Sequence, residues 1–190
     1  MKNNSKKLGQ LFILIGLLLV LYVFASYRET DTITRQPALQ QSRQMTGNLQ
    51  MVKPGEKIGA IIIPSKKKSI PVYEGTSAKI LEKGAGHYRK SALPGENNNV
   101  VLSGHRDTYF RFLKDLAKND SVILKTSEID YEYKITKFSI VASNDTTILS
   151  PKSRPILTLT TCYPFSFIGN APKRYIVTAE LVKTSDLVGK

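Results

Sequence analysis

The sequence predicts a mainly β domain, folded as a barrel or a sandwich, over the region that follows residue 55. Short runs rich in β-branched and aromatic residues recur through this region, turn-forming residues separate them, and helical character is minor. Many short strands with turn residues between them are typical of these two architectures. With 190 residues and 41% hydrophobic content, the chain can form one such core, and it contains no internal repeat.

The expected strands follow one another at short intervals. They are 58–63, 70–73, 99–103, 121–126, 131–136, 138–142, 156–160 and 174–182. A capped helical turn is expected at 77–83, and a short helix with one apolar face at 110–116. The run Lys66-Lys67-Lys68, between the first two strands, is expected to be a solvated hairpin tip.

The N-terminal residues predict a membrane anchor. Leu8 to Tyr27 gives 20 residues, of which only Gln10 and Ser26 are clearly polar. At about 1.5 Å per residue, a helix of this length spans roughly 30 Å, the thickness of a bilayer's hydrocarbon core. Lysines precede the run and mixed charges follow it, so we expect an uncleaved single-pass anchor with the amino terminus inside. A cleaved signal peptide is the competing interpretation, but it normally has a shorter apolar region and a better small-x-small site.

Composition divides the chain into three parts. Residues 1–27 are the cytoplasmic tail and anchor, and residues 28–55 are a polar linker with five glutamines between Gln36 and Gln50. Residues 56–190 are expected to form the folded β domain. The predicted localisation is therefore the cell membrane, with this domain extracellular.

The net charge is +13, from 28 Lys and Arg against 15 Asp and Glu. The basic residues are scattered, and no aromatic-rich nucleic-acid motif accompanies them, so we expect no nucleic-acid partner. A basic exterior suits an anionic surface such as a bacterial cell wall or membrane. A single cysteine excludes a disulfide within the chain and a thiolate zinc cluster, and two histidines make a His-rich metal site improbable.

Cys162 is that single cysteine, and composition alone does not distinguish it from a buried, inert thiol. It follows the β-branched run 156–161 and precedes Tyr163-Pro164. Because proline cannot donate to a continuing strand ladder, the strand should end there. A reactive group at the end of a rigid strand can open into a cleft, so Cys162 is a candidate nucleophile.

Two further residues can provide the chemistry that a cysteine nucleophile needs. His105 follows the strand 99–103, and a histidine can activate a thiol and later protonate a leaving amine. Arg174 begins the strand after Cys162, and its charge can stabilise an oxyanion if the two strands are adjacent. Each residue alone is a weak signal, but the order His, Cys, Arg, each at a strand end, is consistent with acyl transfer.

The same segments resemble the sortase family. The run Thr158-Leu159-Thr160-Thr161-Cys162 is similar to the TLxTC signature of sortases, residues 102–107 (LSGHRD) resemble their histidine segment, and Arg174 falls where their arginine is expected. The segments most similar to class D sortases are 84–88, 91–95, 160–165 and 169–175. The resemblance covers residues 56–183.

The resemblance implies an eight-stranded β-barrel with short helices and a cysteine transpeptidase activity. Sortases cleave an LPXTG-like sorting signal of secreted proteins through a thioacyl-enzyme, which an amine of a peptidoglycan precursor or a pilin then resolves. Carried over to this chain, Cys162 is the nucleophile, His105 the acid/base and Arg174 the oxyanion- or substrate-positioning residue. Thr161 and Thr160 are weaker candidates for contacts to the substrate or the oxyanion.

Three other polar residues near these segments are expected to be structural. His87, in a glycine-flanked turn, should be a hydrogen-bonded loop histidine, although it could compete with His105 as the base. Arg106 and Asp107 are expected to form structural pairings. No obvious acidic cluster is present, so we expect no metal requirement and no other cofactor.

Other protein classes stay open at this stage. An L,D-transpeptidase would carry a His-Gly-Cys type segment, whereas threonines precede Cys162 here. A papain-like or cell-wall endopeptidase would place its cysteine before its histidine, the reverse of the order in this chain. A non-catalytic cell-wall-binding module would bury Cys162 as an inert residue, which a thiol-reactive probe would reveal.

Overall fold

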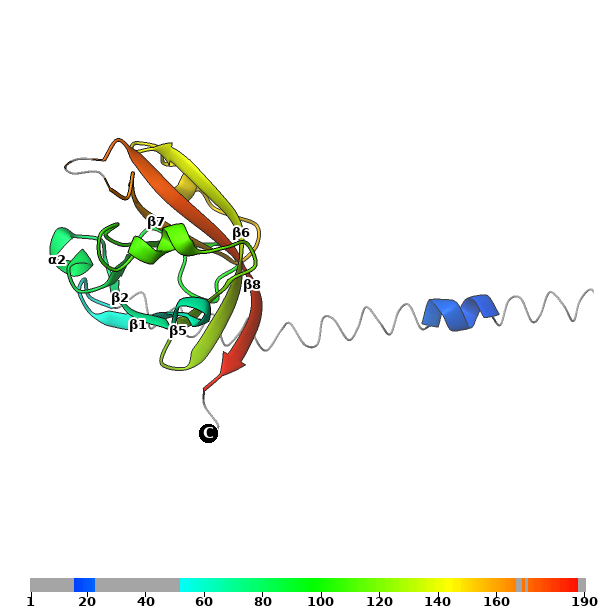
Figure 1. Cartoon of the computed structure of the whole chain (residues 1–190). Coiled ribbons are helices and arrows are strands. Elements are labelled where there is room, and N and C mark those ends of the chain that lie inside the picture. Colours follow the sequence, from blue (N-terminus) through cyan, green and yellow to red (C-terminus); the bar gives the residue numbers. More distant parts are fainter. Residues whose placement is uncertain (1–15, 23–51, 167–168, 170, 188–190) are drawn as a thin grey trace, which may run out of the picture. The chain divides into compact units, whose positions relative to one another are not determined.

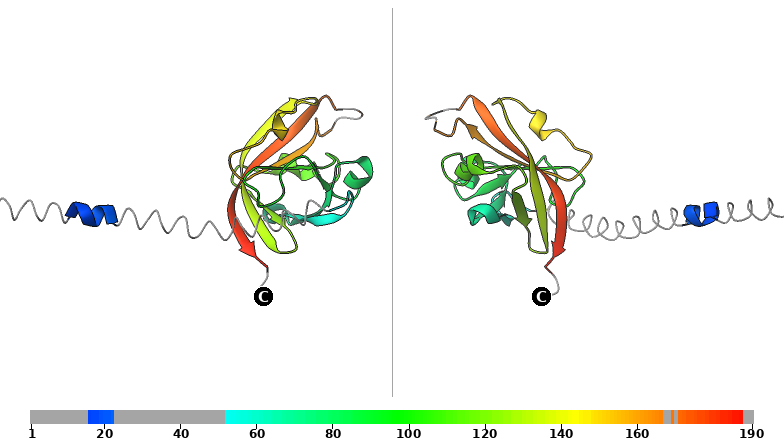
Figure 2. Two further views of the ribbon diagram at one scale, coloured as in Figure 1. Left: turned by 180° about the vertical axis from the view of Figure 1, so that it is seen from behind. Right: turned by 45° about the vertical axis from the view of Figure 1, so that its right-hand side comes forward.

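The computed structural model describes residues 16–22, 52–166, 169 and 171–187. The chain divides into two compact units, residues 1–45 and 46–190. All the described strands lie in the second unit, where they form a closed barrel with short helical turns in its loops (Figures 1 and 2). The predicted mainly β fold is therefore confirmed, and the architecture is a barrel rather than a sandwich.

The barrel has eight described strands, most of them short. Their bounds are β1 (Lys57–Ile63), β2 (Lys68–Glu74), β3 (Ala85–His87), β4 (Asn99–Ser103), β5 (Ser121–Lys125), β6 (Ile129–Ala142), β7 (Ile156–Tyr163) and β8 (Lys173–Asp186). The helical turns of this unit are η1 (Pro64–Lys66), α2 (Ala78–Leu81), η2 (Arg111–Asp115) and η3 (Thr147–Leu149).

The strands close in the order β1-β2-β3-β4-β7-β8-β6-β5. β2 pairs with β3 and β4 with β7 in parallel, and the other neighbouring strands pair antiparallel. β7 therefore lies between β4 and β8, although β4 is far from both in the sequence. The three residues predicted to act in catalysis lie on β7, on β8 and directly after β4.

Apolar side chains fill the barrel and pack against β7 in its wall. Leu157 and Leu159 of β7 are fully buried, as are their partners on β8, Ala179 and Val177. Burying a side chain of the size of leucine stabilises a fold by about 1.5–3 kcal/mol. Further fully buried side chains are Ile61, Ile63, Val72, Leu102, Phe110, Leu113, Leu124, Tyr133 and Ile135. Because residues 156–161 are all buried, β7 is a firm support for the residues that follow them.

Most expected strands agree with the structure to within a few residues. β4 has the predicted bounds, and β7 ends at Tyr163, directly before Pro164, as the missing proline N–H predicts. The lysine run at 66–68 lies at the connection of the antiparallel strands β1 and β2. The sequence does not predict β3, because Ala85-Gly86-His87 lacks the β-branched residues that mark a strand.

One long strand, β6, replaces the two strands expected at 131–136 and 138–142. Its pairing with β8 shifts register between Ile135 and Lys137, which indicates a bulge. A bulge adds one residue and bends a strand without ending it. The interruption in the sequence pattern therefore reflects an irregular strand and not a turn.

The first unit is described only at residues 16–22, which are helical and exposed. Most of the predicted anchor from Leu8 to Tyr27, and most of the predicted linker at 28–55, lie outside the described residues. Among the residues that are described, no helix has the length and apolar character needed to cross a membrane.

Candidate active site

Cys162 and Arg174 face each other across two neighbouring strands. Cys162 is the penultimate residue of β7, Arg174 is the second residue of β8, and the two are direct partners in the antiparallel register. Directly opposed residues share a face of the sheet, with Cβ atoms about 4.5–5.5 Å apart. The strand adjacency on which the sequence argument depended is therefore present, and the thiol is partly exposed.

His105 reaches the other side of Cys162 through the parallel pairing of β4 with β7. Ser103 pairs with Thr160, and the Gly104 amide donates to the Thr160 carbonyl oxygen at 3.2 Å. His105 comes two residues after Ser103, just as Cys162 comes two residues after Thr160. Neighbouring strands lie about 4.8 Å apart, and residues at equivalent positions point to the same face. The pairing therefore brings the turn that carries His105 to the end of β7 that carries Cys162, on the side opposite to β8.

Two hydrogen bonds and a buried ring fix the turn that carries His105. The Thr161 hydroxyl donates to the Gly104 carbonyl oxygen at 2.6 Å, and the Phe110 amide donates to the His105 carbonyl oxygen at 2.9 Å. Phe110 is fully buried, and a β-carbon added at Gly104 would lie 2.7 Å from its ring. Since a packed ring cannot move away without cost, glycine is needed here. The backbone of His105 is therefore held, while its side chain stays partly exposed.

The two threonines before Cys162 lie on opposite faces of β7. Thr161 is buried on the face away from the thiol, and its hydroxyl donates a hydrogen bond to the Gly104 carbonyl oxygen. Thr160 shares the face of Cys162, is 8% exposed, and has a hydroxyl without a hydrogen-bond partner among the described residues. Thr161 therefore supports the histidine turn, whereas Thr160 has an uncommitted hydroxyl on the catalytic face. Their contacts to substrate stay predictions.

Arg174 is anchored at one of its terminal nitrogens. Its Nη1 donates to the carbonyl oxygens of Ala171 at 3.3 Å and Lys173 at 3.1 Å. A guanidinium group has five N–H donors in a planar fork. Donors on the other nitrogens therefore remain for an oxyanion or a substrate carbonyl next to Cys162.

An aromatic cluster supports the Cys162–Arg174 pair from the opposite face of the sheet. The rings of Tyr163 and Tyr175 stack with centroids 6.2 Å apart, and Phe165 packs edge-on at 6.1 and 5.2 Å from them. Each tyrosine directly follows a site residue, so its side chain points to the other face. Burial raises the pKa of Tyr175, and the adjacent Tyr163 adds to the shift. The cluster therefore ties β7 to β8 beneath the site.

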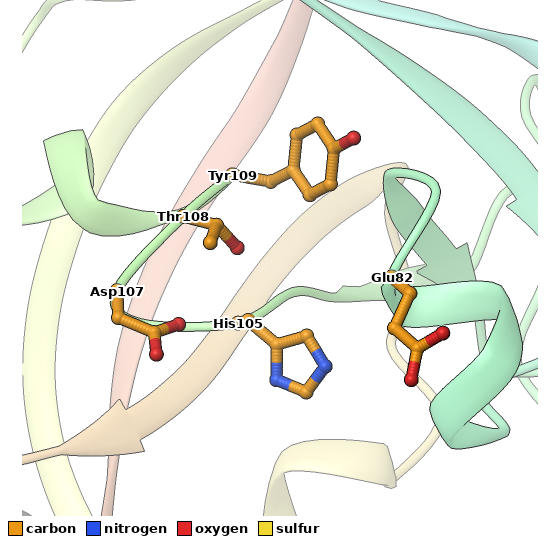
Figure 3. Close-up of a pocket in the computed structure, with 5 residues that line it drawn as sticks. All are labelled: Glu82, His105, Asp107, Thr108 and Tyr109. Carbon is orange, nitrogen blue, oxygen red and sulfur yellow. The ribbon is translucent and has the colours of Figure 1, made fainter.

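A pocket of about 340 Å³ opens beside His105. It is lined by Glu82, His105, Asp107, Thr108 and Tyr109, and Figure 3 shows the imidazole between the two carboxylates. Glu82 lies between α2 and β3, and the pairing of β3 with β4 brings this segment next to His105. Sequence reasoning missed Glu82, because it belongs to no motif and only strand pairing places it at the site.

The two residues after His105 differ in their contacts. Arg106 Nη2 donates to the Gly169 carbonyl oxygen at 3.0 Å, which links the histidine turn to the β7–β8 loop. The carboxylate of Asp107 faces the pocket and makes no hydrogen bond or ion pair with the described residues. The structural pairing expected of both residues is therefore found for Arg106 and not for Asp107.

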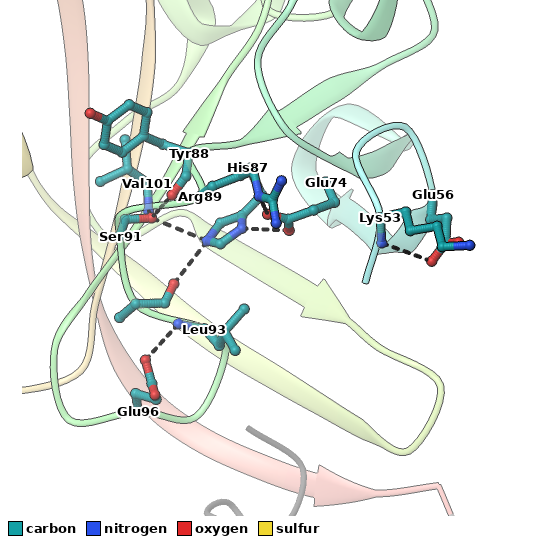
Figure 4. Close-up of polar contacts among 11 residues, drawn as sticks. Lys53, Glu56, Glu74, His87, Tyr88, Arg89, Ser91, Leu93, Glu96 and Val101 are labelled. Atoms are coloured by element: carbon teal, nitrogen blue, oxygen red, sulfur yellow. Dashed lines mark hydrogen bonds and ion pairs between the residues drawn. The ribbon is translucent and has the colours of Figure 1, made fainter. Parts of the chain in front are cut away.

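His87 is buried in β3 at 1% exposure (Figure 4). Its Nδ1 lies 2.8 Å from Oε2 of Glu74, and its Nε2 lies 2.9 Å from the carbonyl oxygen of Ala92. Glu74 Oε1 is also 3.4 Å from Arg89 Nε. Because both ring nitrogens face acceptors, neither is available to a substrate. The prediction of a hydrogen-bonded histidine is confirmed, although His87 lies in a strand and not in a turn.

A metal site needs several donor side chains that converge on one point. Among the described residues, no group of three or more His, Cys, Asp or Glu side chains is arranged to hold a metal ion. The absence of a metal requirement stays a prediction from the sequence.

Comparisons with known proteins connect this arrangement to one family. The family model described as the sortase domain matches residues 61–182, a range that contains all three predicted catalytic residues. Sortase D of Bacillus subtilis (strain 168) is 40% identical over 196 residues, which cover 93% of this chain and 99% of that protein. Sortase SrtE1 of Streptomyces coelicolor is 30% identical over 190 residues, which cover 84% of this chain and 53% of that protein.

Solved structures give the same result. The catalytic domain of SrtD from B. anthracis is 42% identical with a TM-score of 0.61, over 70% of this chain and 91% of that one. The SrtA sortase from Actinomyces oris is 29% identical with a TM-score of 0.64, over 72% of this chain and 85% of that one. The similarity to the two D-type proteins supports the resemblance to class D.

Proposed function

Because this chain belongs to the sortase family of cysteine transpeptidases, we propose that it cleaves an LPXTG-like sorting signal and transfers the acyl group to an amine. Cys162 is the nucleophile of this proposal, His105 the acid/base and Arg174 the group that holds the oxyanion. The observation that carries it is the direct pairing of Cys162 with Arg174 on β7 and β8, together with the β4–β7 pairing that brings the turn of His105 to the same end of β7. The donors are surface proteins with a sorting signal, and the acceptor is an amine of a peptidoglycan precursor or a pilin.

The first half of the proposed reaction uses all three residues. The Cys162 thiolate attacks the carbonyl carbon of the signal's threonine, and the carbonyl oxygen becomes an oxyanion as the C–S bond forms. The free guanidinium N–H groups of Arg174 stabilise this charge. His105 then protonates the leaving amine as the C–N bond breaks, and a thioester remains on the enzyme.

The second half repeats these steps in reverse with a different amine. The acceptor nitrogen adds to the thioester carbonyl, and the neutral imidazole of His105 takes the proton that the nitrogen releases. The tetrahedral intermediate collapses, the C–S bond breaks, and the Cys162 thiolate returns. If water replaces the amine, the same steps hydrolyse the signal.

Peptide cleavage tests the proposed donor. The full-length chain in detergent is incubated with peptides that carry LPXTG, LPNTA and LAXTG signals, and the products are analysed by mass spectrometry. We expect cleavage after the threonine of at least one peptide and an acyl adduct on Cys162. The Cys162→Ala variant should show neither. A folded protein with an intact thiol that cleaves no LPXTG-like peptide would contradict the proposal.

We also propose that residues 8–27 anchor the chain with its amino terminus inside the cell and its barrel outside. The support is the length of the apolar run and the lysines that precede it. Cys162 is the only cysteine and is partly exposed, so it can report the orientation.

A membrane-impermeant maleimide applied to intact cells tests this topology. Wild-type protein should be labelled, and Cys162→Ala should not. A chain that combines Cys162→Ala with Ser5→Cys should be labelled only after lysis. Labelling of that chain in intact cells would place its amino terminus outside and overturn the proposal.

A further inference from the structure

The loop between β6 and β7, residues 143–155, passes from one end of β7 to the other. β6 ends beside the first residue of β8, at the Cys162 end of β7, and β7 begins at Ile156, at its opposite end. None of residues 143–155 is buried, so the loop adds no side chain to the core. A segment with few buried contacts has little stability of its own, and its position depends on its hydrogen bonds.

The middle of this loop is bound to the face of the sheet that carries Cys162. Thr158 is four residues before Cys162, so alternation along the strand puts both side chains on one face. The Thr158 hydroxyl donates to Oδ1 of Asn99 at 2.7 Å, which places the Asn99 carboxamide on that face too. Nδ2 of Asn99 donates to the carbonyl oxygens of Ile148 at 2.8 Å and Ser150 at 3.5 Å.

These contacts allow the carboxamide of Asn99 only one orientation. A carbonyl oxygen can only accept a hydrogen bond, so the amide nitrogen must face the loop and Oδ1 must face the Thr158 hydroxyl. Asn99 is 2% exposed and Thr158 is 3% exposed, so water does not replace either partner. Because an unmet hydrogen bond at a buried group is costly, Asn99 is a rigid link from β4 to the loop.

The other attachments of the loop lie at its two ends. The Ser143 amide donates to the Pro172 carbonyl oxygen at 3.0 Å at the start of the loop, and an ion pair of 2.9 Å joins its end to β8. In the described part of the chain, the hydrogen bonds that join residues 146–152 to the barrel all end on Asn99 and its neighbour Asn98. Oδ1 of Asn98 accepts a backbone amide of the loop at 2.8 Å. The position of the loop's middle therefore depends on these two asparagines.

Thr160 lies between this link and the nucleophile, on the same face of β7. It is 8% exposed, and its hydroxyl has no partner among the described residues. A polar group so deeply buried normally has a partner, so this hydroxyl points to a group that a ligand supplies. An extended peptide advances about 3.3 Å per residue, as a strand does. A sorting signal that follows β7 from Cys162 therefore brings the residues before its threonine to Thr160, beside the loop.

We propose that Asn99 is a positioning residue for the acyl donor, because it holds residues 146–152 at the distance from β7 that the sorting signal needs. Asn99 does not touch the reacting atoms and acts only through the loop. Without its link, the middle of the loop moves away from β7 and the signal binds more weakly, while the chemistry of the bound signal at Cys162 is unchanged. This inference rests on the proposed function and names a residue that sets its donor affinity.

Donor binding without turnover tests the proposal. The full-length chain in detergent carries Cys162→Ala, and anisotropy gives the Kd of a fluorescent form of the signal peptide that wild type cleaves most rapidly. Asn99→Asp keeps the shape of the side chain and the acceptor for Thr158, but it loses the donor to the loop. Asn97→Asp is the matched control, because it adds the same charge at an exposed position two residues away.

The effect on Kd should depend on pH. At about pH 7.5 we expect Asn99→Asp to raise the Kd about 5- to 20-fold, as loss of a buried hydrogen bond predicts, and Asn97→Asp to change it less than about 2-fold. Burial beside carbonyl oxygens should raise the pKa of the introduced carboxyl above its usual value of about 3.9. At about pH 5 its protonated form can again donate to the loop, so the increase should shrink to about 2- to 3-fold.

Kinetics of chains that keep Cys162 separate positioning from general damage. Asn99→Asp should raise KM for the peptide, whereas kcat and the rate at which iodoacetamide alkylates Cys162 should stay within about 2-fold of wild type. Asn98→Ala removes the second bond to the loop and should raise KM by a smaller factor. It provides the test if Asn99→Asp does not fold, and thermal unfolding of each variant at both pH values checks this.

An unchanged donor Kd in folded Asn99→Asp would overturn the inference, and so would a loss of affinity that low pH does not reverse. If Asn99→Asp is unfolded, an unchanged KM in Asn98→Ala has the same meaning. A lower kcat or slower alkylation of Cys162 without a higher KM would show that Asn99 supports the catalytic strands and not the donor. The proposed function fails separately, if wild-type protein cleaves no LPXTG-like peptide.

Discussion

The two histidines of this chain both lie at the end of a strand of the barrel, yet their surroundings differ completely. His87, the last residue of β3, is 1% exposed and has an acceptor at both ring nitrogens, from Glu74 and Ala92. His105, beyond the end of β4, is partly exposed, lines a pocket, and makes no hydrogen bond through its ring with the described residues. Of the two rings, only that of His105 is accessible to a substrate.

The comparison shows that hydrogen-bond saturation separates a structural histidine from one whose ring is open to a ligand. The contacts of His87 join β2, β3 and the loop after β3, so they stabilise the barrel. His105 has a well-held backbone and an uncommitted ring, and the cost of its exposure is small because water can solvate the imidazole.

Removing the imidazole at the site should abolish activity with little effect on stability. His105→Ala is expected to lower kcat/KM for signal cleavage by about 10²–10⁴-fold, the usual value of general acid–base catalysis. Its free energy of unfolding should stay within about 0.5 kcal/mol of wild type, because the ring makes no internal hydrogen bond. Peptide cleavage and denaturant unfolding measure the two effects. If His105→Ala retained activity, another residue would be the catalytic base, and His87 would be the first candidate.

Removing the buried imidazole of His87 should lower the stability of the fold and leave the activity of the folded protein nearly unchanged. His87→Ala leaves the Glu74 carboxylate buried without its ring partner, which costs about 3–5 kcal/mol. The folded fraction should keep cleaving peptide at a rate near wild type. The combined change Glu74→Leu and His87→Leu should cost less than the two single changes together, because no buried charge is left unpaired and Arg89, which also loses Glu74, is half exposed to solvent. Additive costs would show that the pair is not coupled.

Substitution of Arg174, on the β8 side of Cys162, should give the next largest effect. Arg174→Ala should lower kcat for cleavage by about 10²–10³-fold, as loss of an oxyanion donor does. Arg174→Lys keeps the charge but loses the planar fork, so we expect it to recover only part of this loss. Single-turnover acylation of Cys162 separates this effect from binding. If Arg174→Ala raised only KM, the residue would position the substrate and not stabilise the oxyanion.

A substitution at Gly104 can strain the turn that holds His105 while the imidazole itself stays unchanged. Gly104→Ala places a β-carbon 2.7 Å from the Phe110 ring and should cost about 1–3 kcal/mol of stability. Because His105 is the next residue, activity should fall in the folded protein as well. Thr161→Val, which removes the hydrogen bond to the Gly104 carbonyl, is a gentler change in the same direction. A loss of stability without any change in kcat would show that this turn does not set the position of the His105 imidazole for catalysis.

High pH should destabilise the barrel at β6, away from both histidines. Burial, with smaller contributions from the charges of Glu128 and Asp186, raises the pKa of Tyr131 to about 12. A pKa that is higher in the folded than in the unfolded state means that stability is intact below pH 10 and falls between about pH 10 and pH 12. In the Tyr131→Phe variant, the free energy of unfolding should fall less over this pH range than in wild type. Denaturant unfolding across that pH range, with phenolate absorbance as the second signal, measures it.

Much of the catalytic site could be predicted from short segments of sequence. Cys162 is distinguished by a β-branched run before it and a proline shortly after it, and both features act locally on the strand. The proposed role of Arg174, in contrast, depended on the adjacency of β7 and β8, which the structure provides. Glu82 could not be predicted at all, because the pairing of β3 with β4 brings it to His105 and β3 has no strand pattern.

The sequence by itself determined the strand-forming segments, the types of reactive side chain and the motifs that mark the family. These depend on local backbone preference and on the chemistry of single side chains, which a short segment contains in full. Only the tertiary structure decided which strands are neighbours, which face each side chain occupies and which histidine is free to react. Those properties arise from pairing and burial between distant segments. Glu74 of β2 binds the ring of His87, and the parallel register of β4 and β7 brings the turn of His105 to the end of the strand that carries Cys162.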